Sequence, residues 1–391
     1  MTPPASRSFR CPVRRVMMTT DAVGGVWTYS LELARALGEH GVEVFLAAMG
    51  ALPNSNQRAE AGRVENVRLV ESSFRLEWMR DSWDDVQRAG EWLLSLEDCV
   101  TPDVIHLNGY CHAALPWHAP VLSVGHSCVL SWWLAVKGEP APATWDRYGR
   151  EVKRGLHAAD MVVAPSAAML RKLEENYGPF GRSRVIPNAR MPERFIPSVK
   201  EPFVLSAGRL WDEAKNVALL ARVAPRLPWP VYVAGDAKHP NGAERRIRNV
   251  HALGPLPSER LAAWLGRASI FVLPARYEPF GLSILEAALS GCALVLGDIP
   301  SLRENWEGVA RFVPPDDEAS LESAIKGLIR NESMREALSH LGRLRALEFT
   351  PRRMAAGYLS AYREVMQSHQ RFDPELSPVR LIAACNAPRL N

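Results

Sequence analysis

The sequence predicts an α/β protein built from two consecutive doubly wound parallel-sheet domains. Short apolar strands alternate with amphipathic helices from residue 13 to about residue 313. Residues 195–202 interrupt this alternation near the middle of the chain with two prolines, and a length of 391 residues suits two domains. Because strand–helix alternation builds a parallel sheet covered on both faces, each half of the chain is expected to form one such sheet.

Hydrophobic periodicity places the individual elements. In the first half, strands are expected at residues 13–20, 42–49, 66–70, 103–107, 120–125, 160–164 and 184–187, and helices at 26–39, 83–96 and 145–157. In the second half, strands are expected at 203–207, 231–234, 251–253, 269–273 and 293–296, and helices at 216–226, 257–267, 282–289, 321–329, 334–349 and 354–369. The predicted division is a first domain at 1–198, a second at 199–353, a C-terminal helix at 354–371 and a tail at 372–391.

Composition excludes several classes of protein. Hydrophobic residues make up 47% and charged residues 23% of the chain, as in ordinary globular proteins. The net charge of +4 is mild and no basic run is present, so nucleic acid is not expected as a partner. Six scattered cysteines without a C-x-x-C pair indicate a reducing compartment, with neither a zinc site nor a disulfide framework. The expected location is the cytoplasm, with peripheral contact at the inner face of the membrane left open.

The segment Glu-Pro-Phe-Gly-Leu-Ser-Ile-Leu-Glu carries the strongest functional signal. It follows an apolar strand and opens a helix, so the amides at Phe280, Gly281 and Leu282 are expected to form a helix tip suited to a phosphate. Glu286 lies one turn below that tip, where it could accept hydrogen bonds from ribose hydroxyls. Glu278 lies on the loop, within reach of a sugar beyond the phosphates. The alternative is that both glutamates are solvated surface charges.

Two further segments offer groups that bind phosphate. Gly24 and Gly25 follow the first strand and open the first helix, where free amides can approach a ligand closely, although a plain strand-to-helix connection explains them equally well. Arg209 at a strand end and Lys215 at a helix start present two cations to one cleft. The alternative is a solvated loop in which Lys215 pairs with an acidic neighbour.

Histidine and tryptophan side chains mark a third segment. His126 follows a buried strand and could contact the sugar or the acceptor, or could be a hydrogen-bonded core residue. Trp132 and Trp133 follow in an expected apolar loop, where they could stack on a sugar, contact a lipid or pack against a core. The chain has no D-x-D pair to hold a metal, and it lacks the Walker A and G-x-S-x-G motifs of P-loop ATPases and α/β-hydrolases.

The two glutamates with Pro-Phe-Gly between them resemble the E-x7-E signature of retaining GT-B glycosyltransferases, most closely family 4. The glycine loop, the Gly-Arg-Leu…Lys segment and His126 resemble further motifs of that family, and the resemblance covers about residues 13–355. Three features depart from its pattern. Ser127 stands where the family often has aspartate, the Ile-Pro-Asn corner changes after Asn188, and the Arg-to-Lys spacing is one residue longer.

The resemblance implies two Rossmann-like domains facing a central cleft, with the last helix crossing back to the first domain. It implies retaining transfer of a hexosyl group from a nucleoside diphosphate sugar to a hydroxyl of a sugar, glycan or lipid-linked acceptor, in surface-polysaccharide or glycoconjugate synthesis and without a metal or other cofactor. Arg209 and Lys215 would hold the leaving diphosphate, Glu286 the ribose, and Glu278 and His126 the sugar. A glycan phosphorylase, a sugar-nucleotide epimerase and a non-catalytic subunit of the same fold remain alternatives.

Overall fold

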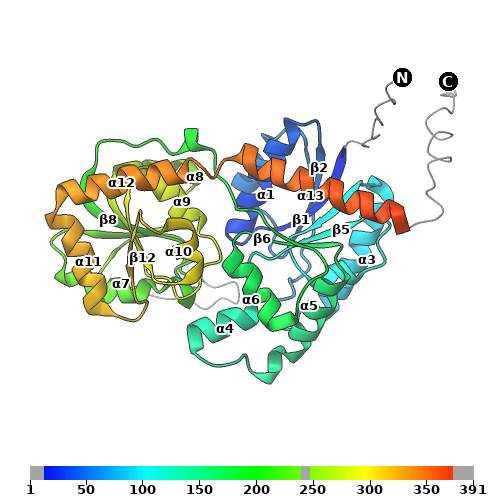
Figure 1. The fold of residues 1–391 in the computed structure, drawn as a ribbon, viewed down its shortest axis with the longest axis horizontal. Coiled ribbons are helices and arrows are strands. Elements are labelled where there is room, and N and C mark those ends of the chain that lie inside the picture. The colour runs from blue at the N-terminus through cyan, green and yellow to red at the C-terminus, as the bar shows by residue number, and fades with distance from the viewer. Residues whose placement is uncertain (1–12, 239–246, 373–391) are drawn as a thin grey trace, which may run out of the picture.

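The computed structural model describes residues 13–238 and 247–372, with side chains described up to residue 369. The predicted tail lies outside the described residues from 373 onward. Within the described ranges the chain forms two α/β units side by side, each with a parallel sheet between helices (Figure 1). The predicted fold class of two doubly wound parallel sheets is therefore confirmed.

The first sheet has seven parallel strands in the order β3-β2-β1-β4-β5-β6-β7. Its strands are β1 (Arg15–Asp21), β2 (Glu43–Met49), β3 (Val67–Glu71), β4 (Val104–Leu107), β5 (Val121–Val124), β6 (Met161–Ala164) and β7 (Ser183–Val185). Its helices are α1 (Gly25–Gly38), α2 (Ser55–Gly62), α3 (Trp83–Val100), α4 (Val129–Lys137), α5 (Asp146–Ala158) and α6 (Ala167–Tyr177). The strand order reverses between β1 and β4, which is where sheets of this type bind ligands, at the carboxyl ends of the strands.

The second sheet repeats this arrangement with six parallel strands in the order β10-β9-β8-β11-β12-β13. Its strands are β8 (Glu201–Ala207), β9 (Val231–Ala234), β10 (His251–Gly254), β11 (Ala268–Leu273), β12 (Ala293–Gly297) and β13 (Arg311–Val313). Its helices are α7 (Val217–Val223), α8 (Ser258–Arg267), α9 (Leu282–Leu289), α10 (Pro300–Trp306), α11 (Glu318–Arg330) and α12 (Glu332–Ala346). The order here reverses between β8 and β11, the strands that precede Arg209 and Glu278.

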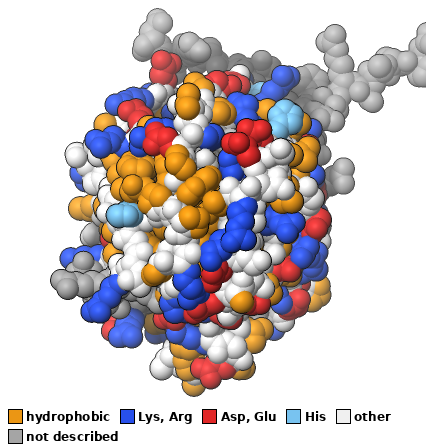
Figure 2. Space-filling model, turned by 90° about the vertical axis from the view of Figure 1, so that its left-hand side faces the viewer, with side chains coloured by type: hydrophobic (Ala, Val, Ile, Leu, Met, Phe, Trp, Pro, Cys, Tyr) orange, Lys and Arg blue, Asp and Glu red, His pale blue; other side chains and the backbone are white. Residues whose placement is uncertain are grey.

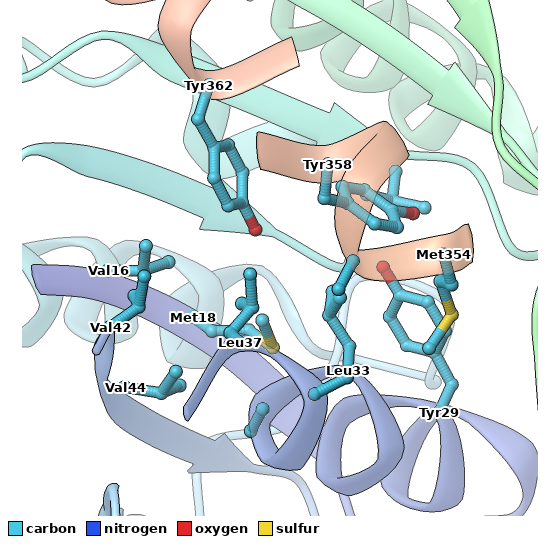
Figure 3. Close-up of a cluster of buried hydrophobic side chains, with 14 of the residues drawn as sticks. Val16, Met18, Tyr29, Leu33, Leu37, Val42, Val44, Met354, Tyr358 and Tyr362 are labelled. Atoms are coloured by element: carbon cyan, nitrogen blue, oxygen red, sulfur yellow. The ribbon is translucent and has the colours of Figure 1, made fainter. Parts of the chain in front are cut away.

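The last helix, α13 (Pro351–Phe372), returns to the first unit and completes its core. Met354, Tyr358 and Tyr362 recur at four-residue spacing and are buried against α1, where Leu33 and Leu37 face them (Figure 3). Residues at this spacing share one helix face, so one apolar stripe is enough to dock the helix. Fully burying each such side chain contributes about 1.5–3 kcal/mol, so α13 is an integral part of the first unit.

The prediction that Trp132 and Trp133 lie in a loop is wrong, because these residues lie on helix α4. The helix reads Val-Leu-Ser-Trp-Trp-Leu-Ala-Val-Lys, which is apolar on nearly every side and so has no clear amphipathic period. It ends at Gly138 in the left-handed conformation, an ordinary helix stop. Helices α2, α6 and α10 and strand β13 are also absent from the predicted elements.

One outer face of the second unit carries exposed apolar side chains. Met334, Leu341 and Leu344 on α12 are 40%, 45% and 51% exposed, and apolar side chains gather on the side of the molecule where α11 and α12 lie (Figure 2). In the described part of the chain, no helix combines the length and the apolar character needed to span a membrane.

Candidate functional site

The predicted site residues come from loops at the carboxyl ends of strands in both sheets. Gly24 and Gly25 follow β1, His126 follows β5, Arg209 follows β8 and Glu278 follows β11. Parallel strands end at the same edge of a sheet, so each set gathers at one edge. Trp132 and Lys137 of the first unit bond to the loop that holds Arg209, and Gly24 lies beside Arg209 itself. These two edges therefore face each other, and the predicted residues lie along that junction.

The glycine loop touches the second unit at two of the predicted phosphate-binding residues. Gly24 has a φ of +88°, and a Cβ atom added there would lie 3.3 Å from Nη1 of Arg209. A Cβ atom added at Gly25 would lie 3.4 Å from Cδ1 of Leu282. A side chain at Gly24 would therefore adopt a strained backbone conformation and crowd the guanidinium. The structure brings the glycine loop, Arg209 and the first residue of α9 together.

Helix α9 begins as the sequence predicts. Its N-cap residue is Gly281, with a φ of +90°, and no described side chain caps the helix start. The amide of Ile284 donates to the Gly281 carbonyl at 3.0 Å, so the amides of Leu282 and Ser283 are the ones that keep their hydrogen-bonding capacity for a ligand. The Phe280 side chain is buried and packs edge-on against Phe349, with ring centroids 5.5 Å apart. Phe280 thus anchors the turn through its side chain and could contact a ligand only through its backbone.

The two cations of the Gly-Arg-Leu…Lys segment pair with carboxylates. Arg209 donates from Nη2 to Asp212 at 2.9 Å, and its buried Nε has no hydrogen-bond partner among the described residues. Lys215 is buried and donates to Oε2 of Glu278 at 2.6 Å. The lysine ammonium thus bonds to one of the two motif glutamates, and the solvated-loop alternative for Lys215 is wrong.

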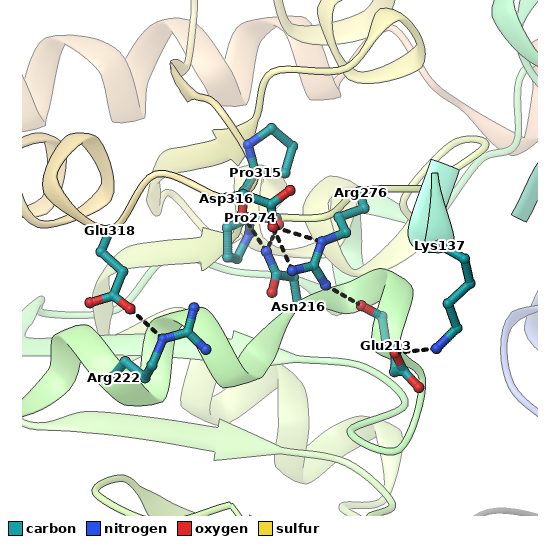
Figure 4. A network of polar contacts seen from close by, with 9 residues as sticks. All are labelled: Lys137, Glu213, Asn216, Arg222, Pro274, Arg276, Pro315, Asp316 and Glu318. Atoms are coloured by element: carbon teal, nitrogen blue, oxygen red, sulfur yellow. Dashed lines mark hydrogen bonds and ion pairs between the residues drawn. The ribbon is translucent and has the colours of Figure 1, made fainter. Parts of the chain in front are cut away.

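A polar network fixes the loop between these cations (Figure 4). Asn216 adopts a φ of +53° and donates its side-chain amide to the carbonyls of two prolines that follow β11 and β13. Arg276 binds Asp316 and also donates to the Glu213 carbonyl at 3.4 Å. From the first unit, Lys137 on α4 donates to the Glu213 carboxylate at 2.8 Å. The loop is therefore held from both units.

Glu286 lies in a buried ion-pair chain that joins the two units. Its Oε1 is 2.8 Å from Nε of Arg190, and Nη1 of Arg190 donates to Oε1 of Glu32 on α1 at 2.8 Å. Glu286 is only 8% exposed and Arg190 3%. Burial raises the pKa of Glu286, while the adjacent Arg190 opposes that rise. Arg190 belongs to the corner that departs from the family pattern after Asn188, and sequence reasoning gave it no role.

His126 is held in one tautomer by a neighbouring amide. Asn108 donates from Nδ2 to the Thr19 carbonyl at 2.7 Å, so its Oδ1 must accept, and it accepts from Nε2 of His126 at 2.8 Å. Burial lowers the pKa of His126 to about 3, so the ring is neutral and Nδ1 keeps a lone pair. His106 donates from Nε2 to the same oxygen at 3.2 Å and accepts from Tyr362 at 2.6 Å. The tyrosine lies on α13, so no sequence-local signal points to this network.

Asp21, the last residue of β1, is a further ionisable group at the junction. Its Oδ1 accepts from the Val23 amide at 2.7 Å, and it lines a cavity together with Arg209. Burial raises the pKa of Asp21 to about 6, against the opposing influence of the Val23 amide and Arg209. Its position just before the glycine pair is the sequence signal that could have identified it.

The cavity has a volume of about 730 Å³ and lies between the two units. His126 and Asn108 line it from the first unit, and Arg209 lines it from the second. Trp132 and Trp133 also line it, and within the described ranges neither indole belongs to a hydrophobic core cluster. The alternative that these tryptophans pack in a core is therefore wrong.

Glu304 of α10 connects the two units at a second place. Its two carboxylate oxygens accept from the amides of Ala167 and Ala168 at 2.7 and 2.9 Å, at the start of α6 in the first unit. Ser166, which precedes that helix, donates to the carbonyl of Pro279 at 2.7 Å. A carboxylate at a helix N-terminus satisfies free amides and complements the dipole. These bonds hold the E-x7-E loop against the first unit.

Two family models match consecutive parts of the chain. Residues 23–194 match Glycosyltransferase Family 4, and residues 201–331 match Glycosyl transferases group 1. Glycogen synthase of Mycobacterium tuberculosis (strain ATCC 25618 / H37Rv) is 24% identical over 399 residues, covering 90% of this chain and 94% of that protein. Sulfoquinovosyl transferase SQD2 of Arabidopsis thaliana is 28% identical over 221 residues, covering 49% of this chain and 42% of that protein.

Solved structures share the arrangement of the two sheets. Sucrose-phosphate synthase from Thermosynechococcus elongatus superimposes with a TM-score of 0.78 at 20% identity, covering 91% of this chain and 100% of that chain. Anabaena HepE in complex with UDP-glucose superimposes with a TM-score of 0.70 at 13% identity, covering 90% and 99%. At these identities the likeness shows the fold, which is GT-B. With both family models matched in order along this fold, the chain belongs to the family 4 (group 1) glycosyltransferases of the GT-B fold.

Proposed function

We propose that this glycosyltransferase moves a hexosyl group from a nucleoside diphosphate sugar to a hydroxyl acceptor, with retention of anomeric configuration and without a metal ion. The observation that carries the proposal is the convergence of Gly24, Arg209 and the uncapped start of α9. Backbone amides, a guanidinium with an unused Nε and a helix N-terminus are the groups that stabilise a diphosphate. In the proposed complex they would lie beside the leaving group, where charge develops during transfer.

The donor would lie with its diphosphate between the glycine loop and α9. Arg209 and Lys215 then meet the phosphate oxygens, while Glu286, one turn inside α9, reaches the ribose hydroxyls. Arg190 supports this role because it opposes the burial that would protonate Glu286. Glu278 and the bare Nδ1 of His126 would accept hydrogen bonds from hydroxyls of the transferred sugar.

In the proposed reaction, the bond between the anomeric carbon and the phosphate oxygen breaks, and the acceptor oxygen bonds to that carbon from the same face. The acceptor proton passes to the departing phosphate oxygen, so atoms and charge balance. The protein residues orient the reactants and stabilise the leaving charge, which accounts for the absence of an assigned nucleophile. In the described ranges, no group of three histidine, cysteine, aspartate or glutamate side chains is arranged to hold a metal. The charge on the leaving group would be stabilised by Arg209 and Lys215.

The donor is best sought first with UDP-glucose, since HepE, a structural relative, holds that compound. Release of nucleoside diphosphate from UDP-, GDP-, ADP- and dTDP-glucose would be measured for the wild type, for Arg209→Ala and for a control, Arg222→Ala, whose guanidinium pairs with Glu318 on the outer face. Loss of Arg209 is expected to slow turnover about a hundredfold, equivalent to roughly 3 kcal/mol. An unchanged rate would remove Arg209 from the mechanism.

The remaining features of the reaction have their own readouts. Proton NMR of the first product formed would show the donor's anomeric configuration if the reaction retains it, and inversion would contradict the proposal. The rate should also persist in excess EDTA. Release of sugar 1-phosphate that depends on inorganic phosphate would instead indicate a phosphorylase.

A further inference from the structure

We infer that the 730 Å³ cavity binds the acceptor and that this acceptor is a neutral carbohydrate. This assignment rests on the proposed function, because the cavity adjoins the proposed diphosphate site through Arg209. Asp21, Asn108 and His126 line it from the first unit, so an acceptor hydroxyl placed there would lie beside the sugar to be transferred. The volume lies within the range of roughly 300–1,000 Å³ that is usual for small-molecule sites.

Aromatic rings gather on the lining of this cavity to an unusual degree. Of the 12 tryptophans in the chain, five partly exposed ones line it, two of which, Trp78 and Trp145, also pack against a core cluster: Trp78, Trp132, Trp133, Trp145 and Trp211. The indole N–H of Trp132 donates to Asp212 at 3.0 Å, which fixes the plane of that ring. Trp133 lies edge-on to Trp132 with centroids 5.9 Å apart, so the orientation of the second ring follows from the first. Nζ of Lys137 lies over one face of Trp132, 5.7 Å from the ring centroid, so Trp133 is the ring of this pair that we assign to stacking on a flat apolar surface.

Polar groups lie on the same lining as the rings. Asp21, Glu77 and Asp81 supply carboxylate oxygens that can accept hydrogen bonds, whereas Oδ1 of Asn108 already accepts from His126 and His106. A pyranose ring presents C–H groups on its faces and hydroxyl donors around its rim, so it can stack on indole faces while its hydroxyls meet these acceptors. An acyl chain would cover the same carboxylates without bonding to them, which carries a desolvation penalty. The mixed lining therefore favours a sugar over a lipid tail.

The charges on the lining favour a neutral ligand. Carboxyl groups outnumber guanidinium groups there, with Asp21, Glu77, Asp81, Asp212 and Glu213 against Arg75, Arg80 and Arg209. Pairing removes charges of both signs, because Arg209 is engaged by Asp212, Glu213 is engaged by Lys137, and Arg75 lies 3.8 Å from Asp85. This leaves Asp21, Glu77 and Asp81 against Arg80 on the lining. A phosphate or carboxylate on the acceptor would thus meet more like charge than opposite charge, which disfavours its binding. The structure assigns this cavity to an uncharged sugar or glycan end.

Variants of Trp133 separate stacking from general apolar contact. Trp133→Phe keeps an aromatic face, whereas Trp133→Leu keeps apolar bulk and loses the face. Trp92→Leu is the matched control, because Trp92 is a half-buried tryptophan that packs on Phe74 outside the cavity. For a neutral acceptor, Trp133→Leu is expected to raise the acceptor KM about tenfold relative to the donor KM, and Trp133→Phe to raise it much less. Equal effects of Leu and Phe, or none, would overturn the stacking role.

Binding can be followed without turnover through tryptophan fluorescence of the full chain. The probes are maltose, cellobiose and sucrose, then glucose 6-phosphate and glucuronate, and then phosphatidylglycerol vesicles. Saturable quenching by a neutral sugar that weakens in Trp133→Leu supports the inference. Saturation only with the charged sugars or only with vesicles overturns it.

Donor turnover in the same samples distinguishes this inference from the proposed function. If a nucleotide sugar is hydrolysed or transferred while no neutral sugar binds, the acceptor assignment fails and the proposed function stands. If neutral sugars bind the cavity while no nucleotide sugar is turned over, the proposed function fails and the cavity keeps its assignment as a sugar site.

Discussion

Replacing Arg190 by methionine would leave two buried carboxylates without their shared cation. The arginine is 3% exposed and lies 2.8 Å from both Glu32 and Glu286. Glu32 also lies 3.7 Å from Arg35 and 3.9 Å from Arg194, so the loss of Arg190 falls mainly on Glu286. Removing one member of a buried ion pair typically destabilises a protein by about 3–5 kcal/mol, because the remaining charge stays buried without compensation. Methionine keeps much of the apolar length of the side chain, so the change isolates the loss of charge.

The size of this effect should depend on pH with a definite sign. Burial already raises the pKa of Glu286 above its usual value of 4.5, and Arg190 restrains that rise. Without Arg190, the folded-state pKa of Glu286 rises further above its unfolded-state pKa. At pH values between the two, Glu286 is therefore protonated in the folded state and ionised in the unfolded state. The variant's penalty is therefore least below the unfolded-state pKa and grows as pH rises through the folded-state pKa.

Urea unfolding followed by circular dichroism at pH 5 and pH 8 measures this penalty. We expect a loss of about 3–5 kcal/mol at pH 8, a smaller loss at pH 5, and partial rescue at pH 8 when Glu286→Gln is added. Arg194→Met is the matched control, since that arginine is 44% exposed and lies 3.9 Å from Glu32. Equal penalties at both pH values, or no rescue by Glu286→Gln, would refute the reasoning.

Three other changes test neighbouring parts of the junction. Asp21→Asn should stabilise the protein at pH 8 by up to roughly 3 kcal/mol and hardly at all near pH 4, because the folded-state pKa of Asp21 is about 6 and the stability that its protonated form provides is lost as pH rises. Urea midpoints measured across this pH range would show the difference. A difference that does not depend on pH would contradict the prediction. Glu304→Ala should lower the free energy of unfolding by about 1 kcal/mol in the same assay, because the start of α6 loses the carboxylate that caps it. Glu307→Ala, at the exposed residue that follows α10, is the control, and equal losses in both variants would count against the cap. Glu278→Gln should tighten the binding of UDP, because it releases Lys215 from its ion pair, and should slow transfer. Calorimetry measures the first effect and turnover the second. Weaker binding of UDP would indicate that Lys215 and Glu278 act as a unit.

Much of the fold could be predicted because buried parallel strands are continuous apolar runs. Residues 269–273 illustrate this, since they form the interior of β11 and are covered on both faces by helices. Helix α9 was predictable for a different reason, because its apolar residues keep a helical period and Gly281 supplies a clear start. Local pattern and tertiary burial agree at these positions, so sequence reasoning succeeds there.

The parts that sequence reasoning missed depend on contacts between distant segments. The pairing of Arg190 with Glu286 joins residues 96 positions apart across two sheets, and the bond from His106 to Tyr362 spans 256 positions. Neither pair has a periodic or motif-like spacing from which to infer it. The prediction missed helix α4 for a local reason, because a segment that is apolar on all sides has no amphipathic period. This helix nevertheless places Trp133 on the lining of the cavity.

Each cation assigned to the donor, and the arginine beside the ribose glutamate, is already paired with a carboxylate. Arg209 holds Asp212, Lys215 holds Glu278, and Arg190 holds Glu286. Such pairs give up part of the attraction that free cations would offer to a diphosphate, since each phosphate oxygen must compete with a carboxylate. In return the cations are fixed in place, so little reorganisation is needed when charge develops on the leaving group. Because Glu278 serves both sugar recognition and the positioning of Lys215, changes to this glutamate should slow transfer more than they lower stability.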